Sequence, residues 1–155
     1  QGPDIIIPAD SARQMGDMGG NIMVSASQLI IDGDGSRFST NLVESKYPDW
    51  SRVRPTEFES EATLNAEDLL AACKTVQLGG TMAKFEFADG AVRISNDEAE
   101  SMADATVKES LVVGFNVQYV IDAVVAADSP EITIKLNASK SSEINGAFVV
   151  MPVRL

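Results

Sequence analysis

Side chains that could do chemistry are plentiful in this chain, but their spacing matches no catalytic arrangement. The 155 residues include 23 Asp plus Glu and no His, so neither a Ser-His-Asp triad nor a histidine metal site can be built within the chain. Asp97, Glu98 and Glu100 form an acidic run. Paired carboxylates could do acid–base work; we interpret this run as a solvated loop, and we expect no enzyme activity and no cofactor.

Residues 32–35, which read Asp-Gly-Asp-Gly, resemble the beginning of a calcium-binding loop. Such a loop requires Gly at its sixth position and a bidentate Glu at its twelfth. Those positions hold Arg37 and Val43 in this chain. We therefore predict a hairpin turn and no metal site.

The single cysteine, Cys73, permits no disulfide within the chain, which fits a reducing compartment. It lies on the apolar stripe of a predicted helix. We interpret it as inert core, with a reactive thiol as the alternative.

The bulk composition predicts a globular chain with an acidic surface. Hydrophobic residues make up 45% of the chain and its net charge is -11, which argues against a generally basic nucleic-acid surface and against an anionic-membrane binder. Any DNA contact must be local. Apolar runs stop short of a spanning helix and the start lacks a signal-peptide layout, so we expect a cytoplasmic protein. Residues 1–3, Gln-Gly-Pro, look like the remnant of an engineered protease site.

The elements that must position these side chains follow one pattern three times: a short apolar strand, a helix, then alternating strands. Strands are expected at 5–7, 22–26, 29–31, 38–42, 62–64, 85–87, 92–94, 111–115 and 132–136, and in the tail 148–155. Helices are expected from Pro8 through Met18, from the cap Asn65 to Gly79, and from the cap Asn116 to the exit at Pro130.

Two of these helices show an apolar stripe, and polar stretches separate the later strands. The stripes consist of Leu69, Leu70, Cys73 and Val76 in the second helix and Val117, Val120, Ile121, Val124 and Val125 in the third. A polar stretch runs to Lys108, and a Ser-rich turn spans 139–142. The tail 148–155 is either a buried edge strand or the wall of a binding groove. Pro152 fits the edge strand, because proline is tolerated in a sheet only at an edge or bulge.

The chain contains three of these strand-helix-strands units. If two units pack pseudo-symmetrically into one domain, three units cannot all be paired within the chain. Units two and three then form a complete domain, and unit one is left over. Its partner is expected upstream of Asp4 or on another chain, because a lone half-sheet leaves an apolar face and an unpaired edge. Units one and two are joined by residues 46–57, where KYPDWSRVRP at 46–55 has two prolines on either side of Trp50. This predicts an extended, stiff connector.

The connector KYPDWSRVRP, the segment GFNVQYVID at 114–122 and the tail VVMPVRL at 149–155 together resemble the bacterial beta sliding clamp family, the processivity factors of the replicative DNA polymerase. The resemblance covers the chain from Asp4 onward. It implies an α+β DNA-clamp fold of repeated strand-helix-strands units, with antiparallel sheets outside and helices on one face. The family forms a ring around duplex DNA from two crescent subunits of three domains each.

The resemblance also implies a division of this chain into about one and a half clamp domains. Residues 4–45 correspond to the second half of a middle domain, 46–57 to the inter-domain connector, and 58–155 to the complete C-terminal domain. The first half of the middle domain, which completes the peptide socket in the family, is absent from the sequence. Peptide affinity is therefore expected to be reduced.

In the family, a groove between the middle and last domains receives linear motifs of polymerase subunits, the clamp loader and repair proteins. The matching positions here are Pro48, Arg52, Val53, Asn116, Tyr119, Val149, Val150, Met151, Pro152, Val153 and Arg154. Val53, Val149 and Met151 would offer an apolar socket, and Asn116 would bond an extended peptide. Asn116 as a simple helix cap and Tyr119 as an ordinary half-buried aromatic are the alternatives.

Basic residues that could face DNA are few. Arg13 lies on the first predicted helix, Lys74 lies on the second, and the third has none. Few phosphate contacts imply weak, salt-sensitive DNA binding, which suits a homo-oligomeric ring that encircles duplex DNA without sequence specificity. It also suits the alternative function, a stand-alone clamp-like peptide-binding module that does not encircle DNA and competes for clamp-binding motifs.

Overall fold

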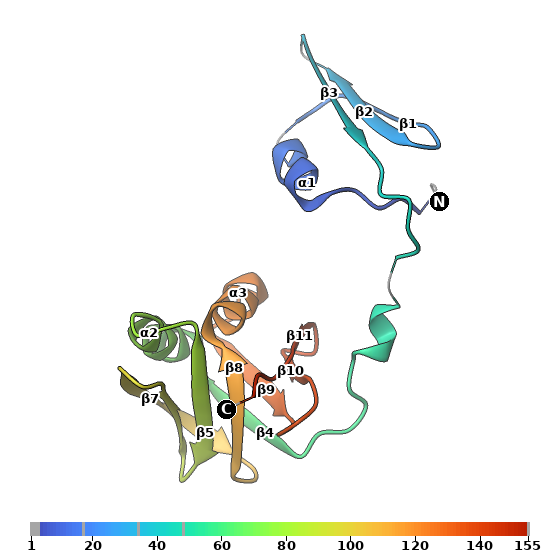
Figure 1. Ribbon diagram of the computed structural model, residues 1–155. Helices are drawn as coiled ribbons and strands as arrows, with labels where there is room; N and C mark the ends of the chain where they lie inside the picture. Colours follow the sequence, from blue (N-terminus) through green and yellow to red (C-terminus); the bar gives the residue numbers. More distant parts are fainter. Residues whose placement is uncertain (1–3, 17, 34, 48, 155) are drawn as a thin grey trace. The chain divides into compact units, whose positions relative to one another are not determined.

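The computed structural model describes residues 4–16, 18–33, 35–47 and 49–154 (Figure 1). The chain divides into two compact units, Gln1–Asp49 and Trp50–Leu155, here called the N-terminal and C-terminal units. The division lies inside the segment 46–57 that the sequence analysis assigns to a connector. The predicted protease-site remnant at 1–3 lies outside the described residues.

The N-terminal unit holds one helix and a three-stranded antiparallel sheet in the order β1-β2-β3. The elements are α1 (Ala9–Met15), β1 (Asn21–Val24), β2 (Gln28–Gly33) and β3 (Ser36–Asn41). Helix α1 ends at Met15, whereas the sequence predicts a helix through Met18. Residues 5–7 are not a strand, contrary to the prediction. The Val43 N–H donates to the Ile6 carbonyl at 2.9 Å.

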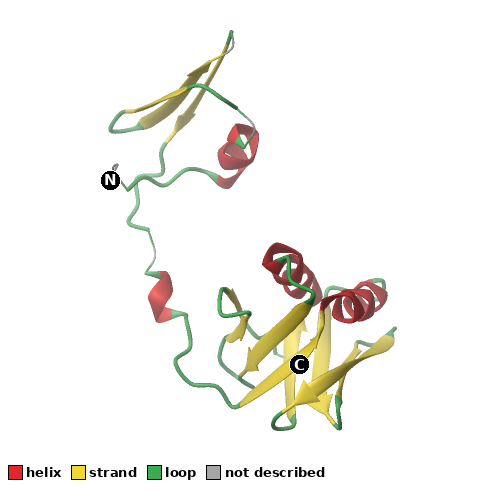
Figure 2. Ribbon diagram, turned by 180° about the vertical axis from the view of Figure 1, so that it is seen from behind, coloured by secondary structure: helices red, strands yellow, loops and turns green. Residues whose placement is uncertain are grey.

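The C-terminal unit is built on an eight-stranded sheet in the order β11-β10-β9-β4-β7-β6-β5-β8. Its elements are the 3-10 turn η1 (Trp50–Arg52), β4 (Ser60–Asn65), α2 (Ala66–Gln77), β5 (Met82–Ala88), β6 (Ala91–Ser95), β7 (Glu100–Val107), β8 (Leu111–Asn116), α3 (Val117–Ala127), β9 (Glu131–Leu136), β10 (Ser142–Ile144) and β11 (Phe148–Val150). Helices α2 and α3 lie side by side over one face of this sheet (Figures 1 and 2).

Two repeats of strand, helix and three strands form this unit and pair reciprocally. The first strand of each repeat pairs with the second strand of the other, β4 with β9 and β8 with β5, all antiparallel. The first repeat also pairs its own ends, β4 with β7. In the second repeat the equivalent contact is the bridge between Gly114 in β8 and Val153 in the tail. The fold is therefore the predicted α+β arrangement of repeated units.

Both helix starts are confirmed at the residues that the sequence indicates. The side chain of Asn65 accepts from the backbone N–H groups of Glu67 and Asp68, and that of Asn116 accepts from Gln118. Each bond satisfies a backbone donor that lacks a partner within the helix. The helices then bury stripes at helical spacing, with Leu69, Ala72, Cys73 and Val76 in α2 and Val117, Val120, Ile121, Ala123 and Val124 in α3. The prediction for Val125 is wrong, because it is exposed.

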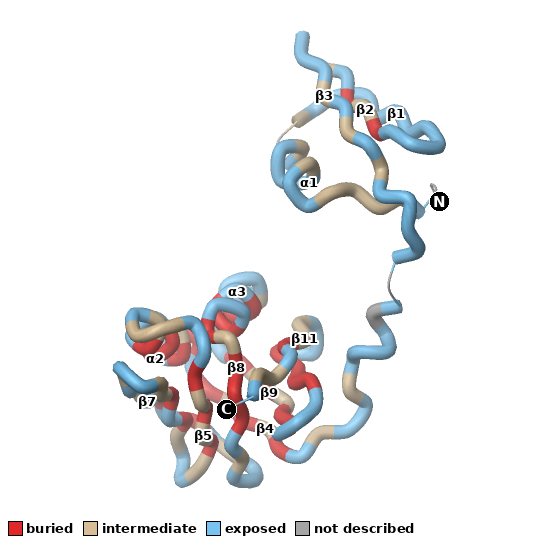
Figure 3. Tube along the Cα trace, in the orientation of Figure 1, coloured by how far each residue is buried: buried red, intermediate tan, exposed pale blue. Residues whose placement is uncertain are grey.

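The core of the C-terminal unit lies between these two stripes and the inner face of the sheet (Figure 3). Phe85 is fully buried, and its ring meets the Phe115 ring edge-on with centroids 5.3 Å apart. In the N-terminal unit the buried hydrophobic residues among those described are Leu29 and Ile31. Among the described residues, none of the helices is long and apolar enough to cross a membrane.

Three stretches differ from the sequence prediction. The polar stretch before Lys108 contains β7, whose inward positions are the small residues Ala103 and Ala105, so that no large apolar alternation marks it. Glu100 begins this strand, whereas Asp97 and Glu98 lie in the turn before it. The Ser-rich turn ends earlier than predicted, because Ser142 begins β10 and is fully buried.

Candidate functional site

The tail does not form one strand over 148–155. It pairs with β10 as far as Val150 and then leaves the ladder. Pro152 has no backbone N–H to donate, and the next residue turns to the opposite edge of the sheet, where the Val153 N–H donates to the Gly114 carbonyl at 2.9 Å. Met151 and Pro152 thus connect β11, at one end of the sheet order, with the bridge to β8, at the other end.

Two open hollows border this crossing segment. The first, here called the helix hollow, has a volume of about 580 Å³ and lies between α3 and β11. It is lined by Tyr119, Asp122, Ala123, Ala126, Ala147, Phe148, Val149, Val150 and Met151. The second, here called the tail hollow, has a volume of about 590 Å³. It is lined by Val112, Val113, Gly114, Ala138, Ser139, Met151, Pro152, Val153 and Arg154.

Met151 lines both hollows. Its side chain is 56% exposed, and Tyr119 on the wall of the helix hollow is 60% exposed. Neighbouring Val149 is half-buried. Large apolar side chains that remain exposed beside a concavity are typical of surfaces that receive a partner, and the unbranched thioether of Met adapts to different shapes.

The segment after η1 is held against the strands that carry the helix hollow. The Val53 carbonyl accepts from Ser141 Oγ at 2.6 Å. Arg54 donates from Nε to Glu143 Oε2 at 2.8 Å and from Nη2 to the Gly146 carbonyl at 3.0 Å. Glu143 stands directly opposite Val149 in the β10–β11 pair. Arg54 therefore fixes the hairpin whose second strand lines the helix hollow.

The structure thus brings together some of the predicted groove residues and not others. Tyr119, Val149, Val150 and Met151 share the helix hollow, and Met151, Pro152, Val153 and Arg154 share the tail hollow. Val53 is exposed but lines neither hollow, and Arg52 is exposed in η1. The Asn116 side-chain oxygen serves as the helix cap. Pro48 lies outside the described residues.

Sequence reasoning missed the helical wall of the helix hollow. Asp122 and Ala126 follow Tyr119 on the same side of α3 at intervals of three and four residues, which is the spacing of one helix face. Reading the outward face of this helix as well as its buried stripe would have found them. Val112 and Ser139 were also missed, because a strand residue and a loop residue meet there only through the fold.

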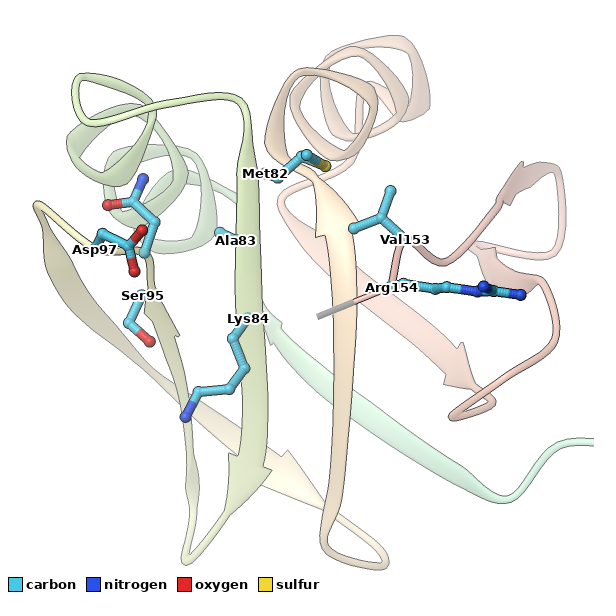
Figure 4. A pocket seen from close by; sticks show the side chains of 8 residues that line it. Met82, Ala83, Lys84, Ser95, Asp97, Val153 and Arg154 are labelled. Carbon is cyan, nitrogen blue, oxygen red and sulfur yellow. The ribbon is translucent and has the colours of Figure 1, made fainter.

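Arg154 also lines a third hollow of about 440 Å³ with Met82 and Lys84 (Figure 4). In this view the side chains of Lys84 and Arg154 point away from one another. Lys84 is paired with Glu86 at 3.2 Å, and Asp97 adds a carboxylate to the lining. Charged side chains of both signs therefore line this hollow.

The two predicted DNA-facing residues are both exposed, but neither belongs to a basic cluster on its helix. Arg13 donates to Asp10 at 2.8 Å on α1, so its charge is partly offset. Lys74 lies in the last turn of α2, a helix that also holds Glu67 and Asp68. Each unit therefore offers little positive charge on its helices.

Comparison with known proteins identifies the family. The family described as DNA polymerase III beta subunit, C-terminal domain, matches residues 51–147. The beta sliding clamp of Streptococcus pneumoniae is 28% identical over 150 residues, which cover 84% of this chain and 39% of that protein. That of Streptomyces coelicolor is 27% identical over 146 residues, covering 80% of this chain and 39% of the relative.

Solved structures agree with the sequence relatives. The crystal structure of the sliding clamp (DNA polymerase III subunit beta) of Bartonella birtlesii bound to griselimycin has a TM-score of 0.83, 25% identity, and coverage of 99% of this chain and 48% of that chain. The chain thus spans about two fifths of the curated relatives and half of the solved structure that it matches. Because the matched domain extends over most of the C-terminal unit, the chain belongs to the family of DNA polymerase III beta subunits, through their C-terminal domain.

Proposed function

We propose that this chain acts as the C-terminal part of a DNA polymerase processivity factor, a sliding clamp that holds replication and repair proteins on DNA. The observation that carries the proposal is the position of Met151, an exposed apolar side chain shared by the helix hollow and the tail hollow. The partners would be polymerase subunits, the clamp loader and repair proteins, each docking through a short linear motif. The role is tethering and requires no catalysis.

The two hollows suit an extended peptide with apolar anchors. Each has a volume within the range of about 300–1,000 Å³ that is usual for ligand sites. The helix hollow offers Tyr119 and Val149 to one anchor, and the tail hollow offers Pro152 and Val153 to a second. A peptide that crosses Met151 would contact both. The groove would also use Arg52 and Val53, the Asn116 amide, and Arg154 toward polar or acidic peptide groups.

The net charge of the chain favours a ring that encircles DNA over a protein that binds the DNA phosphates tightly. The net charge is -11, and the helices offer only isolated basic residues such as Arg13 and Lys74. Attraction to phosphates would therefore be weak and readily abolished by salt. A closed homo-oligomeric ring needs no strong contact, because topology keeps it on the duplex.

A matched pair of methionine variants tests the groove. Met151 and Met102 are both 56% exposed, but Met102 lies on β7 and lines neither hollow. Calorimetry with a Gln-Leu-x-Leu-Phe peptide should show binding to the unaltered chain, a loss of at least roughly tenfold with Met151→Asp, and no change with Met102→Asp. Absence of binding to the unaltered chain, or an equal effect of the two substitutions, would sink the groove assignment.

The tether is tested on plasmid DNA with the native assembly. The protein should stay on closed circular plasmid through a salt wash and leave after the plasmid is linearised. Equal release from both forms would contradict encirclement. Retained peptide binding with that result would indicate the module that competes for clamp-binding motifs without surrounding DNA.

A further inference from the structure

The third hollow continues the path that the helix hollow and the tail hollow form along the tail. Met151 lines the helix hollow and the tail hollow, and Val153 and Arg154 line the tail hollow and the third hollow. The three concavities therefore follow one another in the order of the tail residues. A peptide that runs beside the tail would pass from each hollow to the next.

Four neighbouring segments place one residue each in a row beside the third hollow. Lys84 in β5 stands opposite Ser95 in β6 on one side and opposite Gly114 in β8 on the other, and Gly114 is bridged to Val153 in the tail. Residues that stand opposite one another in this way point to the same face of a sheet. Both neighbours of Gly114 along β8 are buried in the core, so the row lies on the outer face, away from α2 and α3.

Gly114 leaves a gap in this row, because no side chain stands between Lys84 and Val153. Glycine weakens a strand interior and often marks a place that a ligand or another backbone approaches closely. The backbone of β8 does not demand it, since Gly114 is not one of the described glycines with a positive φ. Lys84 does not fill the gap, because its Nζ bonds Glu86 Oε2 at 3.2 Å. The gap is therefore open to a side chain from a partner.

The two side chains that border this gap are apolar. Met82 is 61% exposed, and its side chain points toward Val153 across β8 (Figure 4). Val153 is half-buried. The unbranched thioether of Met adapts to different shapes, and a large apolar side chain exposed beside a concavity is typical of a surface that receives a partner. The chemistry of the gap suits one aliphatic side chain.

We propose that the third hollow is a specificity pocket of the peptide groove, which takes an aliphatic side chain from the residues flanking the docked motif. This inference rests on the proposed function, because it requires a motif seated at Met151. Met151 and Val153 are two residues apart, and an extended chain advances about 3.3 Å per residue. The aliphatic anchor therefore lies within about three residues of the motif. Partners that carry it bind more tightly than partners with a polar residue there.

Peptides with and without the anchor test the pocket. The Gln-Leu-x-Leu-Phe peptide is extended by three residues at either its N-terminal or its C-terminal end. The added residues are all Ser, or hold one Leu at the first, second or third place. Calorimetry with the unaltered chain should show that Leu at one place binds roughly fivefold or more tightly than Ser, because the Leu side chain leaves water. The readout is this ratio of the two affinities.

Two variants locate the gain. Met82→Ser removes an apolar wall and should abolish the advantage of Leu while leaving the affinity of the unextended peptide unchanged. The matched control is Met102→Ser, at an equally exposed Met that lines none of the three hollows; it should keep the full advantage. Gly114→Val fills the gap with a residue that suits a strand, and it should also bring the ratio of Leu to Ser affinity close to one.

Equal affinity of the Leu and Ser peptides at every added place would overturn the pocket, and so would a Leu advantage that persists in Met82→Ser. The unextended peptide separates this failure from failure of the proposed function. If it binds the unaltered chain and Leu gives no gain, the pocket alone is wrong. If none of the peptides binds, the groove assignment and the pocket are both wrong.

Discussion

Arg54 is expected to contribute more to stability than its position after the 3-10 turn suggests, because it is the partner of a buried carboxylate. Glu143 is 4% exposed, and the Arg54 guanidinium bonds both its Oε2 and the Gly146 carbonyl. Removing one partner of a hydrogen-bonded charge costs about 1.5–3 kcal/mol, and about 3–5 kcal/mol when the pair is fully buried. The Arg54 side chain is 46% exposed, so water can partly replace it.

We therefore expect Arg54→Met to reduce the free energy of unfolding by about 2 kcal/mol. With a denaturant slope of about 2 kcal/mol per molar urea, the midpoint would fall by about 1 M. The measurement is equilibrium urea unfolding, followed by circular dichroism and by the reactivity of Cys73, which the fold buries completely. Both probes should give the same shift.

Arg93→Met is the matched control. Arg93 is paired with Glu100 at 3.9 Å, and both side chains are more than half exposed, so this pair should contribute less than about 0.5 kcal/mol. The double variant Arg54→Met with Glu143→Leu should recover most of the lost stability, because no buried charge then lacks a partner. A shift for Arg54→Met no larger than that for Arg93→Met would refute the reasoning.

Two further predictions concern α2. Asn65→Ala removes the cap that accepts from Glu67 and Asp68 and should cost about 1 kcal/mol in urea unfolding, whereas Glu67→Gln, which keeps the capping bonds, should cost less; equal losses would contradict the capping role. Burial raises the pKa of the Cys73 thiol from 9.0 to about 12, so the native chain should not react with a disulfide reagent at pH 8. The Cys73 thiol of the unfolded chain loses its proton at a lower pH than that of the folded chain. The stability that the buried neutral thiol contributes is therefore complete below about pH 9 and is lost as the pH rises towards 12. A Cys73→Ala variant that loses as much stability at alkaline pH would show that Cys73 is not the cause.

Features set by local sequence were predicted well. Asn65 and Asn116 cap their helices because the cap needs only a side chain and the backbone two or three residues away. The buried stripes of α2 and α3 follow from helical spacing. Val125 was misassigned because spacing alone places it beside Val124, whereas only the position of the neighbouring strands decides how wide the buried stripe is.

Features that depend on long-range pairing were not predicted. The β7 strand carries its inward face on Ala103 and Ala105, and small side chains leave no strong alternation in the sequence. The tail crosses from β11 to Gly114 in β8, a strand that lies almost forty residues earlier in the sequence. Pro152 alone therefore indicated only that the terminal strand would be interrupted. The resemblance to clamps brought Tyr119 and Met151 into one hypothesis, but the wall formed by Asp122 and Ala126 required the fold.

The most direct test of the central claim is a peptide titration followed by NMR of the methionine methyl groups. If an extended apolar motif docks across both hollows, the Met151 methyl signal should shift with increasing peptide, while that of Met102 stays in place. The valine methyls of Val149 and Val153 should move at the same peptide concentrations. An unchanged Met151 signal at saturating peptide, or shifts confined to β5–β7, would contradict the assignment of the docking surface.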